Sequence, residues 1–224
     1  MLSTPASVPP SEPCMTTSTK APAESSTALR KRGRVAYISQ FIKQPFVIGA
    51  IAPSSPQLAR RIIQGLGLDK ASVVVEFGPG TGVCTDEILP RLGPNTRFLA
   101  IERNQGMYDE FRRRHPGTTI VNDSAENARA ICEARGMLPV DCIVSGLPWA
   151  SFPDDLQDRL LDAILSVLKP GGDFVTFGYH IGTWLKAGKR FYAELPKRFE
   201  RVERSEIVWQ NFPPAFVVRS TKAR

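Results

Sequence analysis

The chain has 224 residues, a hydrophobic content of 42% and a formal net charge of +7. This length and composition suit one α/β domain with a sizeable core and an appendage, and they argue against two full domains. The first 50 residues carry 6 basic and 2 acidic side chains, residues 51–180 carry 13 and 16, and residues 181–224 carry 10 and 4. The basic ends are typical of arms that meet anionic lipid or nucleic acid, or of a solvated surface.

The sequence argues against a metal centre, a disulfide framework and a secreted or membrane-spanning protein. The four cysteines form no C-x-x-C pair and have no histidine at metal-ligand spacing, so we expect them to be reduced in a cytoplasmic protein. The first residues lack the pattern of a signal peptide, and no run approaches 18 apolar residues. Any work on lipid is then expected from the membrane surface.

The N-terminal quarter divides into two predicted segments. Residues 1–28 are rich in Ser, Thr, Pro and Ala and are expected to be disordered. Residues 29–55 combine a basic amphipathic helix, in which Arg30, Lys31, Arg32 and Arg34 precede apolar residues at helical spacing, with an apolar loop at 46–55. Such a helix can lie in a bilayer interface, cover the mouth of an active site, or do both.

Residues 56–224 alternate between predicted helices and strands. Ser54 or Ser55 caps a first helix that begins at Pro56 and ends at Gly67. Strands are expected at 73–77, 98–102, 119–121, 140–145 and 174–178, with helices at 81–91, from Asn104, at 124–135 and from Asp154 to a stop at 169–172. A basic helical stretch at 182–195 precedes two more strands at 202–209 and 215–220. This order predicts a parallel sheet covered by helices on both sides and completed by an antiparallel edge pair.

The stretch from Val73 to Gly82 organises the domain because a buried strand runs directly into a glycine-rich turn. Glycines at positions 78, 80 and 82 let the backbone approach a ligand closely. A dinucleotide site would place a pyrophosphate here, but Glu76 before the first glycine would repel it. Glu76 is better suited to the α-ammonium of an amino-acid-like ligand, which favours S-adenosylmethionine over NAD. A tight strand-helix connection without a ligand is the alternative.

Acidic residues recur at the carboxyl ends of the next strands, where ligands of open α/β sheets bind. Glu102 ends the second strand and suits the two hydroxyls of a ribose. Asp123 follows the third strand, in the run Asp123-Ser124-Ala125, and suits an adenine amino group. Acids commonly cap helices, but the set of three favours adenosine binding.

The fourth strand ends in Ser145-Gly146-Leu147-Pro148-Trp149, beside the position expected for the reactive group of the ligand. Backbone carbonyls held by Pro148, together with aromatic faces such as Trp149, Tyr37 or Tyr179, suit an amine that becomes cationic on methylation. For Trp149, ordinary core packing is an equally good interpretation. Of the two histidines, His180 is a minor candidate for accepting a proton, and His115, after three arginines, is expected to be solvated.

Four motifs together resemble the soluble bacterial phospholipid N-methyltransferases: GAIAPSS at 49–55, EFGPGTG at 76–82, SGLPW at 145–149 and NFPPA at 211–215. The similarity runs from about Arg34 to about Arg219. It implies a class I methyltransferase fold, with a Rossmann-like seven-stranded, mostly parallel sheet and an antiparallel edge strand, and an N-terminal membrane-binding helix. It implies S-adenosylmethionine as donor and phosphatidylethanolamine or its methylated forms as acceptor, with a chain located at the inner face of the cytoplasmic membrane. The residues expected to bind the donor are Glu76, Gly78, Pro79, Gly80, Thr81, Gly82, Glu102, Arg103, Asp123, Ser124 and Ala125, and those expected at the acceptor are Tyr37, Leu147, Pro148 and Trp149.

Two related activities remain open at this point. Ornithine-lipid methyltransferases belong to the same broad group, and rRNA adenine dimethylases are related to it. The rRNA enzymes carry an Asn-x-Pro-aromatic motif at the end of the fourth strand, and the segment Ser145-Gly146-Leu147-Pro148-Trp149 lacks that asparagine, so a nucleic-acid substrate is not favoured. A non-enzymatic adaptor that binds the donor at a membrane surface is a third possibility. We expect a monomer with an anionic membrane surface and an aminophospholipid as partners, and no metal.

Overall fold

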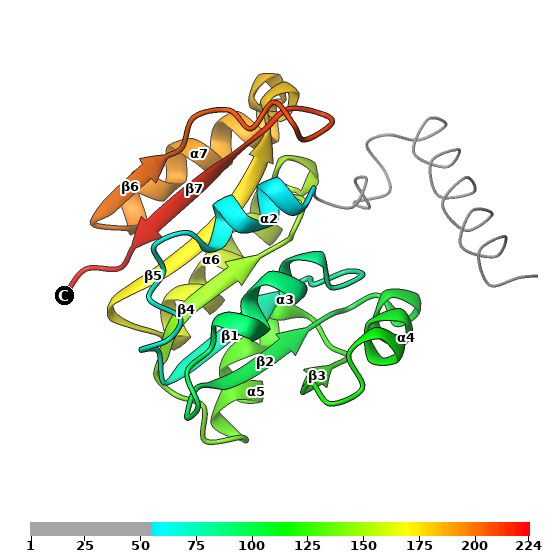
Figure 1. The fold of residues 1–224 in the computed structure, drawn as a ribbon. Coiled ribbons are helices and arrows are strands. Elements are labelled where there is room, and N and C mark those ends of the chain that lie inside the picture. Colours follow the sequence, from blue (N-terminus) through cyan, green and yellow to red (C-terminus); the bar gives the residue numbers. More distant parts are fainter. Residues whose placement is uncertain (1–54) are drawn as a thin grey trace, which may run out of the picture. The chain divides into compact units, whose positions relative to one another are not determined.

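The computed structural model describes residues 55–224, which form a seven-stranded mixed sheet with helices on both faces (Figure 1). The expected segments at 1–28 and 29–55, Ser55 excepted, therefore lie outside the described residues. The strands are β1 (Val73–Phe77), β2 (Arg97–Ile101), β3 (Ile120–Val121), β4 (Val140–Ser145), β5 (Leu168–Tyr179), β6 (Arg201–Arg204) and β7 (Ala215–Thr221). The helices are α2 (Pro56–Ile63), α3 (Val83–Ile88), α4 (Gln105–Arg114), α5 (Ala128–Glu133), α6 (Asp154–Val167) and α7 (Lys186–Arg198), with short 3-10 turns η1 (Leu89–Arg91), η2 (Ala125–Asn127), η3 (Trp149–Ser151) and η4 (His180–Trp184).

The sheet order is β3-β2-β1-β4-β5-β7-β6, and the first five strands in this order are parallel. The predicted α/β class and the Rossmann-like alternation are confirmed. The predicted antiparallel edge pair is also confirmed: β7 lies between β5 and the edge strand β6 and is antiparallel to both. Burial explains this order, because the first four residues of β7 are all buried whereas three of the four residues of β6 are exposed. The shorter, more polar strand takes the edge.

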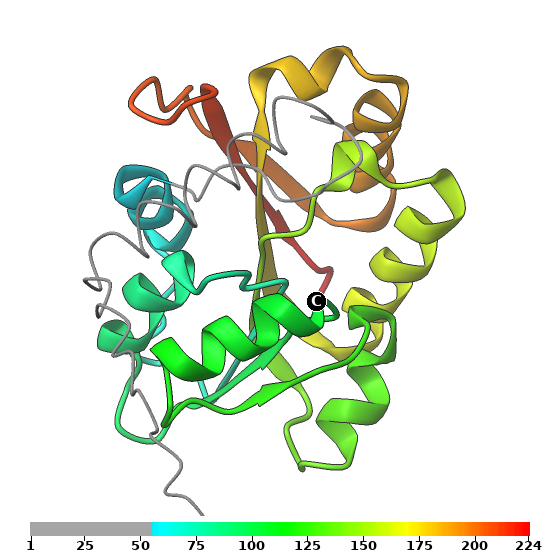
Figure 2. The same ribbon diagram turned by 90° about the vertical axis from the view of Figure 1, so that its right-hand side faces the viewer.

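Two apolar cores sit on the two faces of the sheet. The helices α2 and α3 cover one face, and α5, α6 and α7 cover the other (Figure 2). Buried side chains of these helices pack against the sheet in the two cores. Alternate residues of β1 divide between them: Val75 and Phe77 join the α5–α7 side, and Val74 joins the α2–α3 side. Because side chains alternate along a strand, Glu76 points toward α3.

Local signals in the sequence fix the starts of two helices. The Ser55 hydroxyl accepts a hydrogen bond from the Leu58 N–H, and the Asn104 side chain does the same for Met107, so both predicted caps are confirmed. The first helix ends at Ile63, before the expected Gly67.

Two predicted boundaries near the C-terminus were wrong. Residues 169–172, expected to be a turn that stops a helix, lie inside β5, where a bulge at Val140/Cys142 shifts the pairing with β4 and the Lys169 ammonium pairs with Asp141. The strand expected at 202–209 ends at Arg204, and Val208 forms only an isolated bridge with Ala215.

The aromatic packing on the α7 side yields a stability prediction. Phe191 of α7 is fully buried, and its ring stacks on Trp149 at a centroid distance of 4.4 Å. Phe191→Ala is expected to lower the free energy of unfolding by about 3–5 kcal/mol, because it leaves a cavity in the core. Phe212→Ala, at a side chain that is 86% exposed, should change it by less than about 0.5 kcal/mol. Urea unfolding followed by circular dichroism measures both, and equal losses would contradict this packing.

Candidate functional site

The glycine turn after β1 presents bare backbone at the carboxyl edge of the sheet. Gly78, Gly80 and Gly82 all have positive φ angles, of 64°, 57° and 82°, which L side chains rarely adopt. A Cβ atom at Gly80 would have no neighbour within 4 Å, so this part of the turn faces open space. Gly82 is the N-cap of α3, and the turn therefore leads into the amino end of that helix.

Backbone contacts hold the turn against the ends of the neighbouring strands. The Gly78 N–H donates to the Ile101 carbonyl at 2.9 Å, and the Gly146 N–H donates to the Phe77 carbonyl at 2.8 Å. A Cβ atom at Gly146 would lie 2.5 Å from the Gly78 carbonyl oxygen, and one at Gly78 would lie 2.8 Å from Leu147 Cδ2. The structure thus brings the predicted donor turn into contact with the predicted acceptor segment.

Glu76 lies beneath this turn, with 1% of its surface exposed. Its Oε2 accepts a hydrogen bond from the Thr85 hydroxyl of α3 at 2.6 Å. The pKa of this carboxyl is raised to about 8, mainly by burial; the Thr85 hydrogen bond lowers it, and the nearby charges of Asp86 and Glu102 add to the rise. The structure shows that Glu76 ties β1 to α3. Its expected contact with an ammonium group stays a prediction.

Glu102 follows β2 and is 9% exposed. Its Oε2 accepts from the Gly80 N–H at 3.2 Å, and its Oε1 accepts from the Asn104 N–H at 2.8 Å. A carboxylate has about four acceptor positions, so Glu102 retains acceptor capacity for hydroxyl groups. This carboxylate therefore links the glycine turn to the start of α4.

The remaining predicted donor residues lie beside Glu102. Arg103 is exposed. The Asp123 carboxylate accepts from the Ser124 N–H at 2.6 Å and from the Asn127 side chain at 2.9 Å, and Ser124 caps η2, in which Ala125 is buried. Asn122 donates to the Glu102 carbonyl at 2.9 Å, which joins the ends of β2 and β3.

The acceptor candidates divide between the site and the core. Leu147 and Pro148 are half-buried, with Leu147 against Gly78. Trp149 is only 2% exposed, its indole N–H donates to the Ser145 hydroxyl at 3.2 Å, and its ring packs among Phe152, Phe174 and Phe191. These contacts are those of a core residue. Tyr37 lies outside the described residues.

Two residues that support the glycine turn were missed because they sit in the basic run at the end of α4. Arg114 donates to the Thr81 carbonyl at 2.8 Å and pairs with Asp86. His115 was expected to be solvated, but its side chain is 9% exposed, packs beneath Gly82 and lies 3.4 Å from Asp86 Oδ1. Burial lowers the pKa of His115. Only the tertiary fold reveals these contacts.

Gln157 of α6 was also missed, and it supports the acceptor segment from behind. This fully buried amide donates to the carbonyls of Trp149 at 2.9 Å, Phe152 at 3.3 Å and Ala187 at 3.0 Å. Its Oε1 accepts from Arg190 at 3.0 Å. A polar residue on an otherwise apolar helix face is the sequence signal for such a role.

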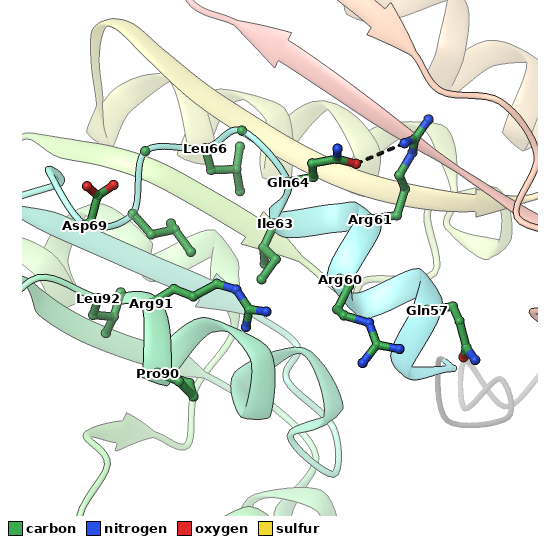
Figure 3. Close-up of a pocket in the computed structure, with 13 residues that line it drawn as sticks. Gln57, Arg60, Arg61, Ile63, Gln64, Leu66, Asp69, Pro90, Arg91 and Leu92 are labelled. Atoms are coloured by element: carbon green, nitrogen blue, oxygen red, sulfur yellow. Dashed lines mark hydrogen bonds between the residues drawn. The ribbon is translucent and has the colours of Figure 1, made fainter.

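A wide cavity of about 920 Å³ lies elsewhere, between α2 with the loop that follows it and η1, and Figure 3 shows its lining. Arg60, Arg61 and Arg91 contribute to its wall, and Arg60 and Arg91 both pair with Glu87. None of the predicted donor or acceptor residues lines it, so its size does not make it the functional site.

The residues at the carboxyl edge fit S-adenosylmethionine in chemical type. The space beside Gly80 is open, and any side chain at this position would occupy space that a ligand could use. Glu102 offers carboxylate acceptors for ribose hydroxyls. Within residues 55–224, no group of three or more His, Cys, Asp and Glu side chains could hold a metal ion. No helix of the described part has the length and apolar character needed to cross a membrane.

The buried carboxyl of Glu76 yields a pH-dependent prediction. Since its folded-state pKa of about 8 exceeds the ordinary value of 4.5, the unfolded chain releases this proton first as the pH rises, and folding stability falls between these values. Glu76→Gln removes the ionisation and keeps an acceptor for Thr85. Its stability relative to the original protein should be unchanged near pH 4.5 and should increase by up to about 5 kcal/mol at pH 9.

Urea unfolding at several pH values measures this difference, and Glu133→Gln, at an exposed position, is the control. A stability difference that is the same at pH 5 and pH 9 would rule out the shifted ionisation.

Comparison with known proteins identifies the family. A family model described as "Methyltransferase domain" matches residues 74–172. An ornithine lipid N-methyltransferase from Singulisphaera acidiphila is 32% identical over 182 residues, which cover 80% of this chain and 91% of that protein. Solved structures with a similar fold include an O-methyltransferase from Bacillus cereus in complex with SAH (TM-score 0.59, 14% identity, 85% of this chain and 91% of that one) and TomG from Streptomyces achromogenes in complex with SAM (TM-score 0.58, 16% identity, 89% and 92%). The chain belongs to the class I S-adenosylmethionine-dependent methyltransferases.

Proposed function

We propose that this enzyme methylates the amino group of a membrane lipid, with ornithine lipid as the best-supported acceptor. One observation carries the proposal: the similarity to the ornithine lipid N-methyltransferase spans 91% of that protein. The general methyltransferase match covers residues 74–172 only, whereas the match to the lipid enzyme covers 182 residues. If the two proteins shared only their donor-binding part, the similarity would not be expected to cover 91% of the lipid enzyme.

The acceptor segment supports an amine substrate. S-adenosylmethionine supplies a methyl group bound to a positively charged sulfur. The protein's task in such a displacement is to hold the two reactants in line and to exclude water. Leu147 packs on Gly78, so the segment after β4 borders the donor turn directly. In this proposal Leu147 and Pro148 border the amine, and Glu102 holds the donor ribose. Trp149 is buried, so its role is to position the segment that carries Leu147 and Pro148.

The proposal includes a membrane-bound acceptor. We infer that the enzyme works at an anionic bilayer, at the inner face of the cytoplasmic membrane. The basic residues Arg30, Lys31, Arg32 and Arg34 support this inference through their charge, although they lie outside the described residues.

Phosphatidylethanolamine is the second candidate acceptor, supported by the sequence motifs at 49–55, 145–149 and 211–215. An rRNA adenine is less well supported. In the Asn-x-Pro-aromatic motif of the rRNA enzymes, the asparagine would fall at Gly146, so no side-chain amide is present there to hold the adenine amino group.

Lipid analysis tests the proposed activity. When the protein is expressed in a host that makes both ornithine lipid and phosphatidylethanolamine, mass spectrometry is expected to detect ornithine lipid carrying one to three additional methyl groups. Methylated phosphatidylethanolamine alone would instead assign the second candidate. Transfer of radiolabelled methyl groups to RNA, with none to either lipid, would exclude the proposal.

The contact between Gly146 and Gly78 yields a prediction for donor binding. Gly146→Ala forces a Cβ atom against the Gly78 carbonyl, so the turn has to shift, and affinity for S-adenosylhomocysteine should fall at least about tenfold. Gly117→Ala is the matched control, because a Cβ atom there has no neighbour within 4 Å and Gly117 is not among the positive-φ glycines. Calorimetry measures both, and unchanged affinity in Gly146→Ala would refute the role of this contact.

A further inference from the structure

Four large hydrophobic side chains are exposed within residues 55–224, and all four come from two short segments. Ile181 and Trp184 belong to η4 and are 54% and 70% exposed. Trp209 and Phe212, in the connection between β6 and β7, are 70% and 86% exposed. Apolar residues scattered singly over a surface need no explanation, but aromatic residues gathered in two adjoining segments indicate an interaction surface.

The two segments lie side by side. The His180 N–H donates to the Pro214 carbonyl at 2.9 Å, and Tyr179 is the register partner of Ala215. In Figures 1 and 2, η4 and the β6–β7 connection lie at the same end of the sheet, where β5 ends and β7 begins. We call these four side chains, with their two segments, the aromatic edge.

The aromatic edge is built against the acceptor segment. A Cβ atom at Gly182 of η4 would lie 3.3 Å from Ala150 Cβ. Gly188 of α7 approaches the Gly182 carbonyl so closely that a side chain there would overlap it, and it also faces Ala150. Since Ala150 follows Trp149 directly, a surface that covers the aromatic edge also lies close to Leu147 and Pro148.

The charge around this edge is positive. Residues 174–193 contain no acidic residue, and the β6–β7 connection contains one, Glu206. Lys186 and Lys189, at the start of α7, are exposed, and neither forms an ion pair with another described residue. Aromatic side chains with nearby lysines are the combination that settles at the interface of an anionic bilayer, with the rings at the headgroup level.

We propose that the aromatic edge is the surface by which the catalytic domain itself inserts into the interface of an anionic bilayer, with Lys186 and Lys189 contacting the headgroups. This inference rests on the proposed function, since a lipid acceptor has to reach Leu147 and Pro148 from the membrane. It assigns the bilayer contact to residues of the methyltransferase domain in addition to the basic N-terminal segment. The contact would present the lipid headgroup at the acceptor side of the site.

Binding to vesicles tests the aromatic edge. The full chain is mixed with vesicles of phosphatidylcholine and phosphatidylglycerol, or of phosphatidylcholine alone, and binding is measured by flotation. Combining Trp184→Ser, Trp209→Ser and Phe212→Ser is expected to weaken binding to the anionic vesicles at least about tenfold, with an unchanged thermal unfolding midpoint because these side chains are exposed. Binding equal to that of the original protein would overturn the inference.

The lysines provide a matched comparison. Lys186→Gln with Lys189→Gln should weaken binding to the anionic vesicles about tenfold and leave binding to neutral vesicles unchanged. Lys70→Gln with Lys197→Gln removes the same charge from exposed positions outside the aromatic edge and should have a much smaller effect. Equal effects of the two pairs would show that only net charge matters and would contradict a defined surface.

Tryptophan fluorescence gives an independent readout. Trp149 is buried, so quenching by brominated lipids in the vesicles reports Trp184 and Trp209. Quenching is expected in the original protein, and its absence despite vesicle binding would overturn the inference.

A dimer in solution that the triple variant dissociates would assign the edge to self-association instead. Failure of the original protein to methylate any aminolipid would exclude the proposed function, whereas lipid methylation with vesicle binding that is insensitive to these substitutions would exclude only the aromatic edge.

Discussion

The close approach of two backbone segments, at Gly78 and Gly146, is the constraint on which the site depends. Parallel pairing sets Phe77 beside Ser145, so the segments that leave β1 and β4 begin next to each other. They stay together because neither carries a side chain at the point of contact, where a Cβ atom at Gly146 would lie 2.5 Å from the Gly78 oxygen. The predicted donor turn and the predicted acceptor segment therefore form one unit, in which Leu147 packs against Gly78.

Glu76 and Glu102 have different roles because they occupy different positions relative to the ends of their strands. Glu76 is the fourth residue of β1 and points sideways toward α3, where burial favours its neutral form and Thr85 holds it. Glu102 follows the last residue of β2, so its carboxylate lies at the open edge, where it accepts from the Gly80 N–H of the turn and the Asn104 N–H before α4. Position relative to the strand end thus decides whether a carboxyl group supports the fold or is available to a ligand.

The sequence predicted the sheet, the glycine turn and the caps at Ser55 and Asn104, because alternation, glycine spacing and capping are local properties. It did not predict that residues 169–172 extend β5, since the bulge in β4 and the pairing of Lys169 with Asp141 are tertiary features. The sequence also did not predict the contacts of Arg114, His115 and Gln157, because they too are tertiary. A basic run on a helix is typical of a solvated surface, and only the fold shows that this one reaches Thr81 and Gly82.

The C-terminal part of the domain explains how one sheet can serve both the donor and the proposed lipid acceptor. Placing β7 between β5 and β6 brings the segment that precedes β7 beside η4, which follows β5. If β7 did not lie between β5 and β6, the β6–β7 connection would not be placed beside η4. The small residues Ala150, Gly182 and Gly188 then let η4 and α7 pack tightly behind the segment after β4. Residues outside the proposed donor site thereby determine what surrounds the proposed acceptor segment, and this is where specificity among related methyltransferases is expected to arise.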